Sequence, residues 1–129
     1  MIRRYRNGGA LIYIPTLVAS NTLASSTSHS VTYTTKVTGE PGSIVGFKVT
    51  TYAASGGASP NYQVNGTSHV LNDTFNLTLD GSGQVTFTQL VDVGTTTSGN
   101  SLDVILTIET TSIGYVSGSA NNTNISKTV

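Results

Sequence analysis

Residues 75–91 read FNLTLDGSGQVTFTQLV, and this stretch is the clearest indication of the fold class. Apolar residues alternate with polar ones on both sides of a central DGSG; the apolar positions are Phe75, Leu77, Leu79, Val85 and Phe87. Because the side chains of a β-strand point alternately to its two faces, this period of two predicts two strands that each have one buried face. The glycines between them predict a tight hairpin at residues 80–83. The alternation changes phase at Leu90, which predicts a β-bulge in the second strand.

The same signature recurs along most of the chain. Further alternating segments lie at residues 31–37, 43–52 and 102–110, with a last pair at 113–118 and 124–129. EPGS at residues 40–43 predicts a type II turn, because Gly42 accepts the positive φ at its third position. The predicted core contains the large inward-facing residues Phe47, Phe75, Leu77, Phe87, Leu106 and Ile108. Short strands at this spacing predict an antiparallel sandwich of about 7–8 strands.

Composition supports an all-β chain. The 129 residues suffice for one domain with a core, and 36% of them are hydrophobic. Only 9% are charged, against about 25% in a typical domain. The polar share comes from 22 Thr, 16 Ser and 10 Asn, and Thr is a β-branched residue that favours strands. The chain has no Cys, which excludes disulfides and thiolate metal sites.

The segment FNLTLDGSGQVTFTQLVDV at residues 75–93 resembles the strands of bacterial Ig-like (Big-type) domains, which occur in surface adhesins and in phage virion proteins. PGSIVGFKVT at residues 41–50 matches the turn and inward-facing strand of the same domains. The resemblance covers residues 31–129, although the tryptophan and cysteine pair of antibody-type cores are missing. It implies an Ig-like β-sandwich with a structural or binding role rather than an enzyme.

Residues that could perform chemistry are few. The candidates for metal binding are His29, His69, Asp73, Asp80, Asp92 and Asp103, and their spacing matches no zinc or calcium motif. Asp80 is expected to shape its turn, and the other carboxylates to face solvent. No Gly-x-Ser-x-Gly segment marks an activated serine. We therefore expect no enzymatic activity, no metal and no cofactor.

The N-terminal stretch MIRRYRNGGALIYIP differs from the rest of the chain. Its three Arg are half of the six basic residues, so the remainder has three Lys against six acidic residues, a formal charge of −3. The Ser/Thr/Asn run at residues 20–30 is typical of a linker. This divides the chain into an N-terminal arm and linker at residues 1–28 and a sandwich at residues 29–129. Gly8, Gly9 and Pro15 interrupt the pattern of a secretory signal, and the apolar run is far shorter than the about 20 residues of a membrane span.

The arm is the predicted binding site. ALIYI suits addition of a strand to the sheet of another protein, and residues 1–28 could extend about 90 Å, beyond a domain roughly 35 Å wide. The predicted partner-binding residues are Arg3, Arg4, Tyr5, Arg6, Leu11, Ile12, Tyr13 and Ile14. The alternative is that ALIYI forms the first strand of the same sandwich. Nucleic acid is disfavoured, because three phosphate contacts give a salt slope of only about −2.7.

These features favour a structural component of a tailed-bacteriophage virion: a capsid decoration, head-fibre, collar or tail protein. An initiator methionine, a small domain and an apolar arm fit such an assembly protein. Its expected partners are other virion proteins and copies of itself, with no small-molecule substrate. One alternative is an exported bacterial surface adhesin or pilus-like subunit. A second is a carbohydrate-binding accessory module, which would require exposed aromatic side chains at Tyr52, Tyr62 and Tyr115.

Overall fold

The computed structural model describes residues 2–7, 10–15, 18–56, 59–111 and 122–129. Within these ranges every regular element is a strand, which confirms the all-β prediction. The first six strands are β1 (Ile2–Asn7), β2 (Ala10–Pro15), β3 (Val18–Ser26), β4 (Ser30–Thr38), β5 (Ile44–Ser55) and β6 (Asn61–Val64). The others are β7 (Thr67–His69), β8 (Thr74–Thr78), β9 (Gln84–Asp92), β10 (Ser101–Thr111) and β11 (Asn122–Thr128).

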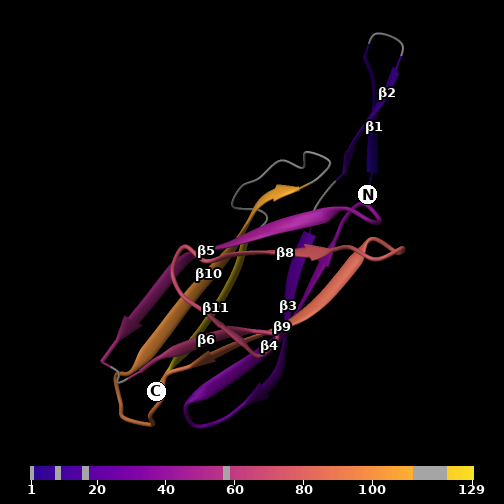
Figure 1. The fold of residues 1–129 in the computed structure, drawn as a ribbon. Helices are drawn as coiled ribbons and strands as arrows, with labels where there is room; N and C mark the ends of the chain where they lie inside the picture. Colours follow the sequence, from indigo (N-terminus) through magenta and orange to yellow (C-terminus); the bar gives the residue numbers. More distant parts are fainter. Residues whose placement is uncertain (1, 8–9, 16–17, 57–58, 112–121) are drawn as a thin grey trace.

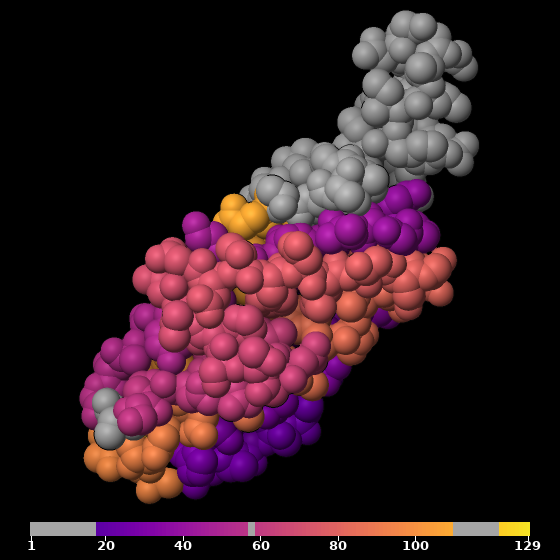
Figure 2. Space-filling view, in the orientation of Figure 1, coloured from indigo at the N-terminus to yellow at the C-terminus, as the bar shows by residue number. Residues whose placement is uncertain are grey.

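Nine of these strands form two antiparallel sheets that pack face to face (Figure 1). One sheet has the order β3-β4-β9-β6-β7, and the other has the order β11-β10-β5-β8. The predicted β-sandwich is therefore correct, with nine described strands rather than seven or eight. The body is elongated along the strand direction (Figure 2).

Seven of the nine strands follow the order of a constant-type immunoglobulin domain. The run β3-β4-β9-β6 corresponds to strands A, B, E and D of that fold, and β5-β10-β11 corresponds to C, F and G. The short strands β7 and β8 are inserted between the fourth and fifth of these seven strands. Each of them adds one strand at the edge of a sheet, and the order of the other seven strands is unchanged.

The core lies between the two sheets and consists mainly of aliphatic side chains. Phe47, Phe87, Leu106 and Ile108 are buried as predicted, each at most 2% exposed. Phe75 and Leu77 are only partly buried, because they lie on β8, an edge strand that has a neighbouring strand on one side only. The Phe75 ring still stacks on Phe47, with 5.1 Å between centroids.

The turn at residues 80–83 joins the two sheets and does not close a hairpin. It is tight, since Gly83 N donates to Asp80 O (3.0 Å) and Asp80 N donates to Gln84 O (2.9 Å). However, β8 pairs with β5, whereas β9 pairs with β4 and β6. The hairpin prediction is wrong, because local alternation and turn residues do not determine which neighbour supplies a strand's hydrogen bonds. The type II turn at residues 40–43 is confirmed by the φ of +77° at Gly42 and the Ser43 N to Glu40 O hydrogen bond.

The predicted bulge at Leu90 is absent from β9, whose register against β4 is unbroken from Gln84 to Asp92. The inward-facing residue at this point is Gln89, which is fully buried, and Leu90 points away from the core. A polar residue in a core position disturbed the apolar pattern without disturbing the backbone. The register shifts lie elsewhere: between Leu23 and Ser25 in β3, and where β5 pairs with β10.

Gln89 is tolerated in the core because other polar side chains surround it. Its Nε2 donates to Thr35 Oγ1 (2.7 Å) and Thr123 Oγ1 (3.0 Å), and its Oε1 accepts a hydrogen bond from the Tyr62 hydroxyl (2.5 Å). Thr35 in turn donates to Asn21 Oδ1 at 2.7 Å. A buried polar network with its partners present stabilises one arrangement of the strands over others. This network connects strands of both sheets.

Tyr62→Phe is expected to lower the free energy of unfolding by about 1–2 kcal/mol at pH 7, because Gln89 loses its short hydrogen bond. Burial also raises the pKa of Tyr62 above its ordinary value of 10.0. Just above pH 10 only the unfolded state therefore releases this proton, and stability falls as the pH rises. Urea unfolding at pH 9 and pH 11 measures the loss, up to about 1.4 kcal/mol for each pH unit above 10. The Phe variant should lose less over this interval; equal losses would contradict the assignment.

The interpretation of residues 20–30 as a linker is wrong for residues 20–26. They belong to β3, which pairs with β4 from Val18 to Ser26, so the sandwich begins before the predicted boundary at residue 29. The sequence pattern did not predict this strand, because it is an edge strand with small or polar residues, such as Ala19 and Asn21, at its partly buried positions. The last strand is confirmed as β11; the segment predicted at residues 113–118 lies outside the described residues.

Candidate functional site

The predicted arm forms a β-hairpin. Strands β1 and β2 pair antiparallel from Ile2 opposite Pro15 to Asn7 opposite Ala10. Residues 2–15 therefore fold back on themselves, and they reach less far than a single extended strand would.

The register of the hairpin brings the two kinds of predicted binding residue together. Arg3 lies opposite Ile14, Arg4 opposite Tyr13, and Arg6 opposite Leu11. The fourth pair of predicted binding residues is Tyr5 opposite Ile12. The cationic positions thus lie on β1, and the apolar positions opposite them lie on β2.

The hairpin is a separate two-stranded sheet. In the described part of the chain β1 and β2 pair with each other and with no strand of the sandwich. ALIYI is therefore not hydrogen-bonded as the first strand of the sandwich. Two strands alone are marginally stable in water, because they bury too little apolar surface to offset the ordering of their backbones.

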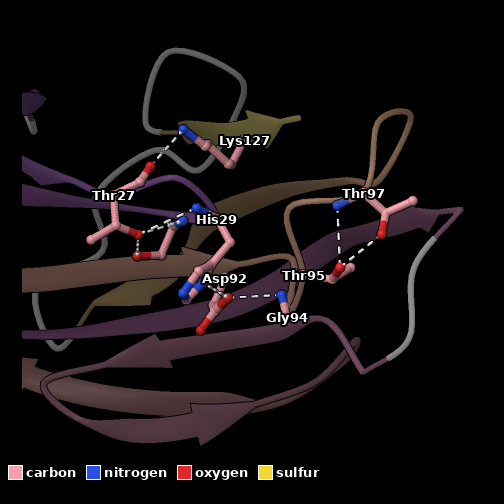
Figure 3. A network of polar contacts seen from close by, with 8 residues as sticks. Thr27, His29, Asp92, Gly94, Thr95, Thr97 and Lys127 are labelled. Atoms are coloured by element: carbon pink, nitrogen blue, oxygen red, sulfur yellow. Dashed lines mark hydrogen bonds and ion pairs between the residues drawn. The ribbon is translucent and has the colours of Figure 1, made fainter.

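A cluster of polar contacts lies around the β3–β4 turn (Figure 3). His29 Nδ1 lies 2.7 Å from Asp92 Oδ1, and the same carboxylate oxygen accepts a hydrogen bond from Gly94 N (2.8 Å). Thr27 O accepts a hydrogen bond from Lys127 Nζ at 3.0 Å. These contacts connect the β3–β4 turn to β9 and β11, so the role of the cluster is structural. These contacts could not be predicted from the sequence, because His29 and Asp92 are 63 residues apart.

In the described part of the chain, the histidines and carboxylates singled out in the sequence lie in separate places. A nucleophile needs a base within hydrogen-bond distance, and the described residues place no hydroxyl against the second ring nitrogen of His29. The four Asp residues considered for metal binding are separate: Asp80 Oδ1 accepts hydrogen bonds from Ser82 N and Gln84 N, as its predicted turn role requires. Asp73 lies 3.4 Å from His69, and Asp103 is exposed. The described ranges contain no group of three potential metal ligands.

Two of the three tyrosines considered for carbohydrate binding lie in the described part of the chain, and neither is fully exposed. Tyr62 is fully buried, so this part of the expectation is wrong. Tyr52 is partly buried, and its hydroxyl donates to Pro60 O at 2.9 Å. Burial raises the pKa of the Tyr52 hydroxyl as well. Tyr115 lies outside the described residues.

Comparison of the chain with protein-family models, with curated proteins and with solved structures finds no match. The fold class that the strand order defines is the immunoglobulin-like β-sandwich. Among the described residues no helix is long and apolar enough to cross a membrane.

Proposed function

We propose that this chain is a structural component of a tailed-bacteriophage virion, attached to neighbouring subunits by its N-terminal hairpin. The observation that carries the proposal is that β1 and β2 pair only with each other in the described part of the chain. A hairpin of this size gains stability by docking on another surface. The resemblance of residues 31–129 to the Ig-like domains of virion proteins is the reason to propose a virion as the assembly.

Charge supports an attachment role for the arm. The arm carries +3 from its three Arg, and the remaining residues carry −3 from three Lys and six acidic residues. The arm of one subunit is therefore attracted to the body of another, and the neutral whole has little net repulsion between copies. The apolar positions of β2 would add affinity, at roughly 1.5–3 kcal/mol for each large side chain buried.

Removal of residues 1–17 provides the main test. The truncated chain keeps all nine sandwich strands, so it should fold with a similar melting temperature. It should no longer co-sediment with purified particles, because it lacks the attachment element. Thermal unfolding followed by circular dichroism and quantitative immunoblotting of particle fractions measure the two properties separately.

Two full-length variants that remove positive charge from different places refine this test. Replacing Arg3, Arg4 and Arg6 with Gln should weaken incorporation, whereas Lys36→Gln with Lys48→Gln should leave it unchanged. If the truncated chain unfolds, the hairpin belongs to the folding unit; if it incorporates normally, the hairpin is not the anchor. Fractionation of the full-length protein with the bacterial envelope instead of with particles would favour the adhesin.

A further inference from the structure

The sandwich has four edges, and they differ in how they are protected from pairing with another chain. Edge strands expose unpaired backbone groups, which proteins protect by short length, charged residues, proline or coverage. β7 has three residues and β8 has five, so both are short. β11 carries Lys127, whose Nζ is held across the edge by Thr27 O.

β3 is the long edge without these protections. Its nine residues, VASNTLASS, contain no charge and no proline. Its backbone pairs with β4 on one side, and no hydrogen bond from its other side is made among the described residues. Its one irregularity, between Leu23 and Ser25, leaves Val18–Leu23 as a regular strand. The indigo atoms of the β3–β4 segment are visible along the lower flank of the body (Figure 2).

Two large apolar side chains are exposed on this same strand. Val18 is 52% exposed and Leu23 is 56% exposed. An uncharged edge with unpaired backbone groups and exposed apolar residues is suited to strand addition. The occupant must itself present a free, unprotected edge.

We propose that the β3 edge is a self-association site, at which β3 of one copy pairs antiparallel with β3 of a second copy. Two features favour a copy of this chain as the occupant. The strand has no charge, so placing it against itself brings no like charges together. Antiparallel self-pairing is also two-fold symmetric and forms a closed dimer, with the two five-stranded sheets joined into one.

A pairing centred on Asn21 makes the regular part of the strand self-complementary. It sets Leu23 opposite Ala19 of the second copy, which covers an exposed apolar side chain, and Ser20 opposite Thr22. This site is separate from the N-terminal hairpin and does not depend on the virion assignment.

Full-length cysteine variants test the proposal, because the native chain has no Cys to interfere. In the proposed pairing the two Thr22 positions are diagonal neighbours at about 7–8 Å, within reach of a short bis-maleimide. Thr22→Cys should therefore give a covalent dimer at micromolar concentration. Ser68→Cys on the β7 edge and Thr88→Cys in the middle of the same sheet are matched exposed controls that should remain monomeric.

Sedimentation velocity of charge variants supplies the second measurement. Wild-type protein should show a concentration-dependent dimer, and Thr22→Lys should weaken it by about tenfold or more, because two Lys then become diagonal neighbours across the paired edges. Thr88→Lys should leave the dimer unchanged. A monomer at all concentrations, equal cross-linking at Ser68→Cys, or a dimer insensitive to Thr22→Lys would overturn the proposal. The last of these results would assign self-association to another surface, such as the arm.

Discussion

Phe87→Ala is expected to lower the free energy of unfolding by about 3–5 kcal/mol, the range for deleting a large aromatic side chain from a packed core. Phe87 is 2% exposed and lies on β9, the central strand of its sheet. Its ring meets Phe47 of the opposite sheet edge to face, with 5.5 Å between centroids. Removing it takes away a main contact between the sheets. Equilibrium urea unfolding at pH 7 measures the effect, and an unchanged m-value would show that the unfolding transition itself is preserved.

Phe75→Ala is the matched control for this prediction. Phe75 also contacts Phe47, through a stacked pair, but it lies on the edge strand β8 and is only partly buried. Less apolar surface returns to water when it is truncated, so its cost should be clearly smaller than that of Phe87→Ala. Equal costs for the two variants would mean that β8 belongs to the core as fully as β9 does.

Gly83→Ala is expected to lower the free energy of unfolding by about 2–4 kcal/mol, the combined cost of a left-handed residue and of a disrupted backbone contact. Gly83 has a φ of +78°, and a Cβ at this position would lie 2.2 Å from Gly39 O. The obstacle is backbone, which cannot rotate away as a side chain can. The two turns would have to separate, at the expense of the Gly39 N to Gly83 O hydrogen bond of 2.8 Å. This contact joins the β4–β5 turn to the β8–β9 turn.

Two other glycines separate the two contributions to this cost. Gly66 has a φ of +81° but no atom within 4 Å of an added Cβ, so Gly66→Ala should cost about 1–2 kcal/mol for its backbone conformation alone. Gly81 lies in the same turn as Gly83, has no positive φ and has open space around it. Its replacement by Ala should be nearly neutral. Thermal and urea unfolding of the three variants should give the order Gly81, Gly66, Gly83; a Gly83 variant as stable as the Gly81 variant would show that the turns are not in contact.

The candidate site was predictable in part. The apolar and basic residues of the arm stand out from an otherwise weakly charged sequence, and that contrast identified them. The hairpin was missed, although NGGA between two apolar-containing runs is turn chemistry, because the run IRRYRN has no clear alternation. The β3 edge gave no signal at all. Its residues resemble a linker, and only the pairing with β4 identifies them as a strand.

The fold class, most of the strands and the inward face of β10 follow from the amino-acid sequence alone, because a period of two in apolar residues is a local property of strands. The turn at residues 40–43 follows from it as well, because proline and glycine act there through their own φ preferences. Three other features became visible only in the folded chain: β8 and β9 belong to different sheets, Gln89 is a core residue, and β3 is an edge strand. Each of these depends on partners distant in sequence: the strands that complete a ladder, and the side chains of Tyr62, Thr35 and Thr123 that satisfy a buried amide.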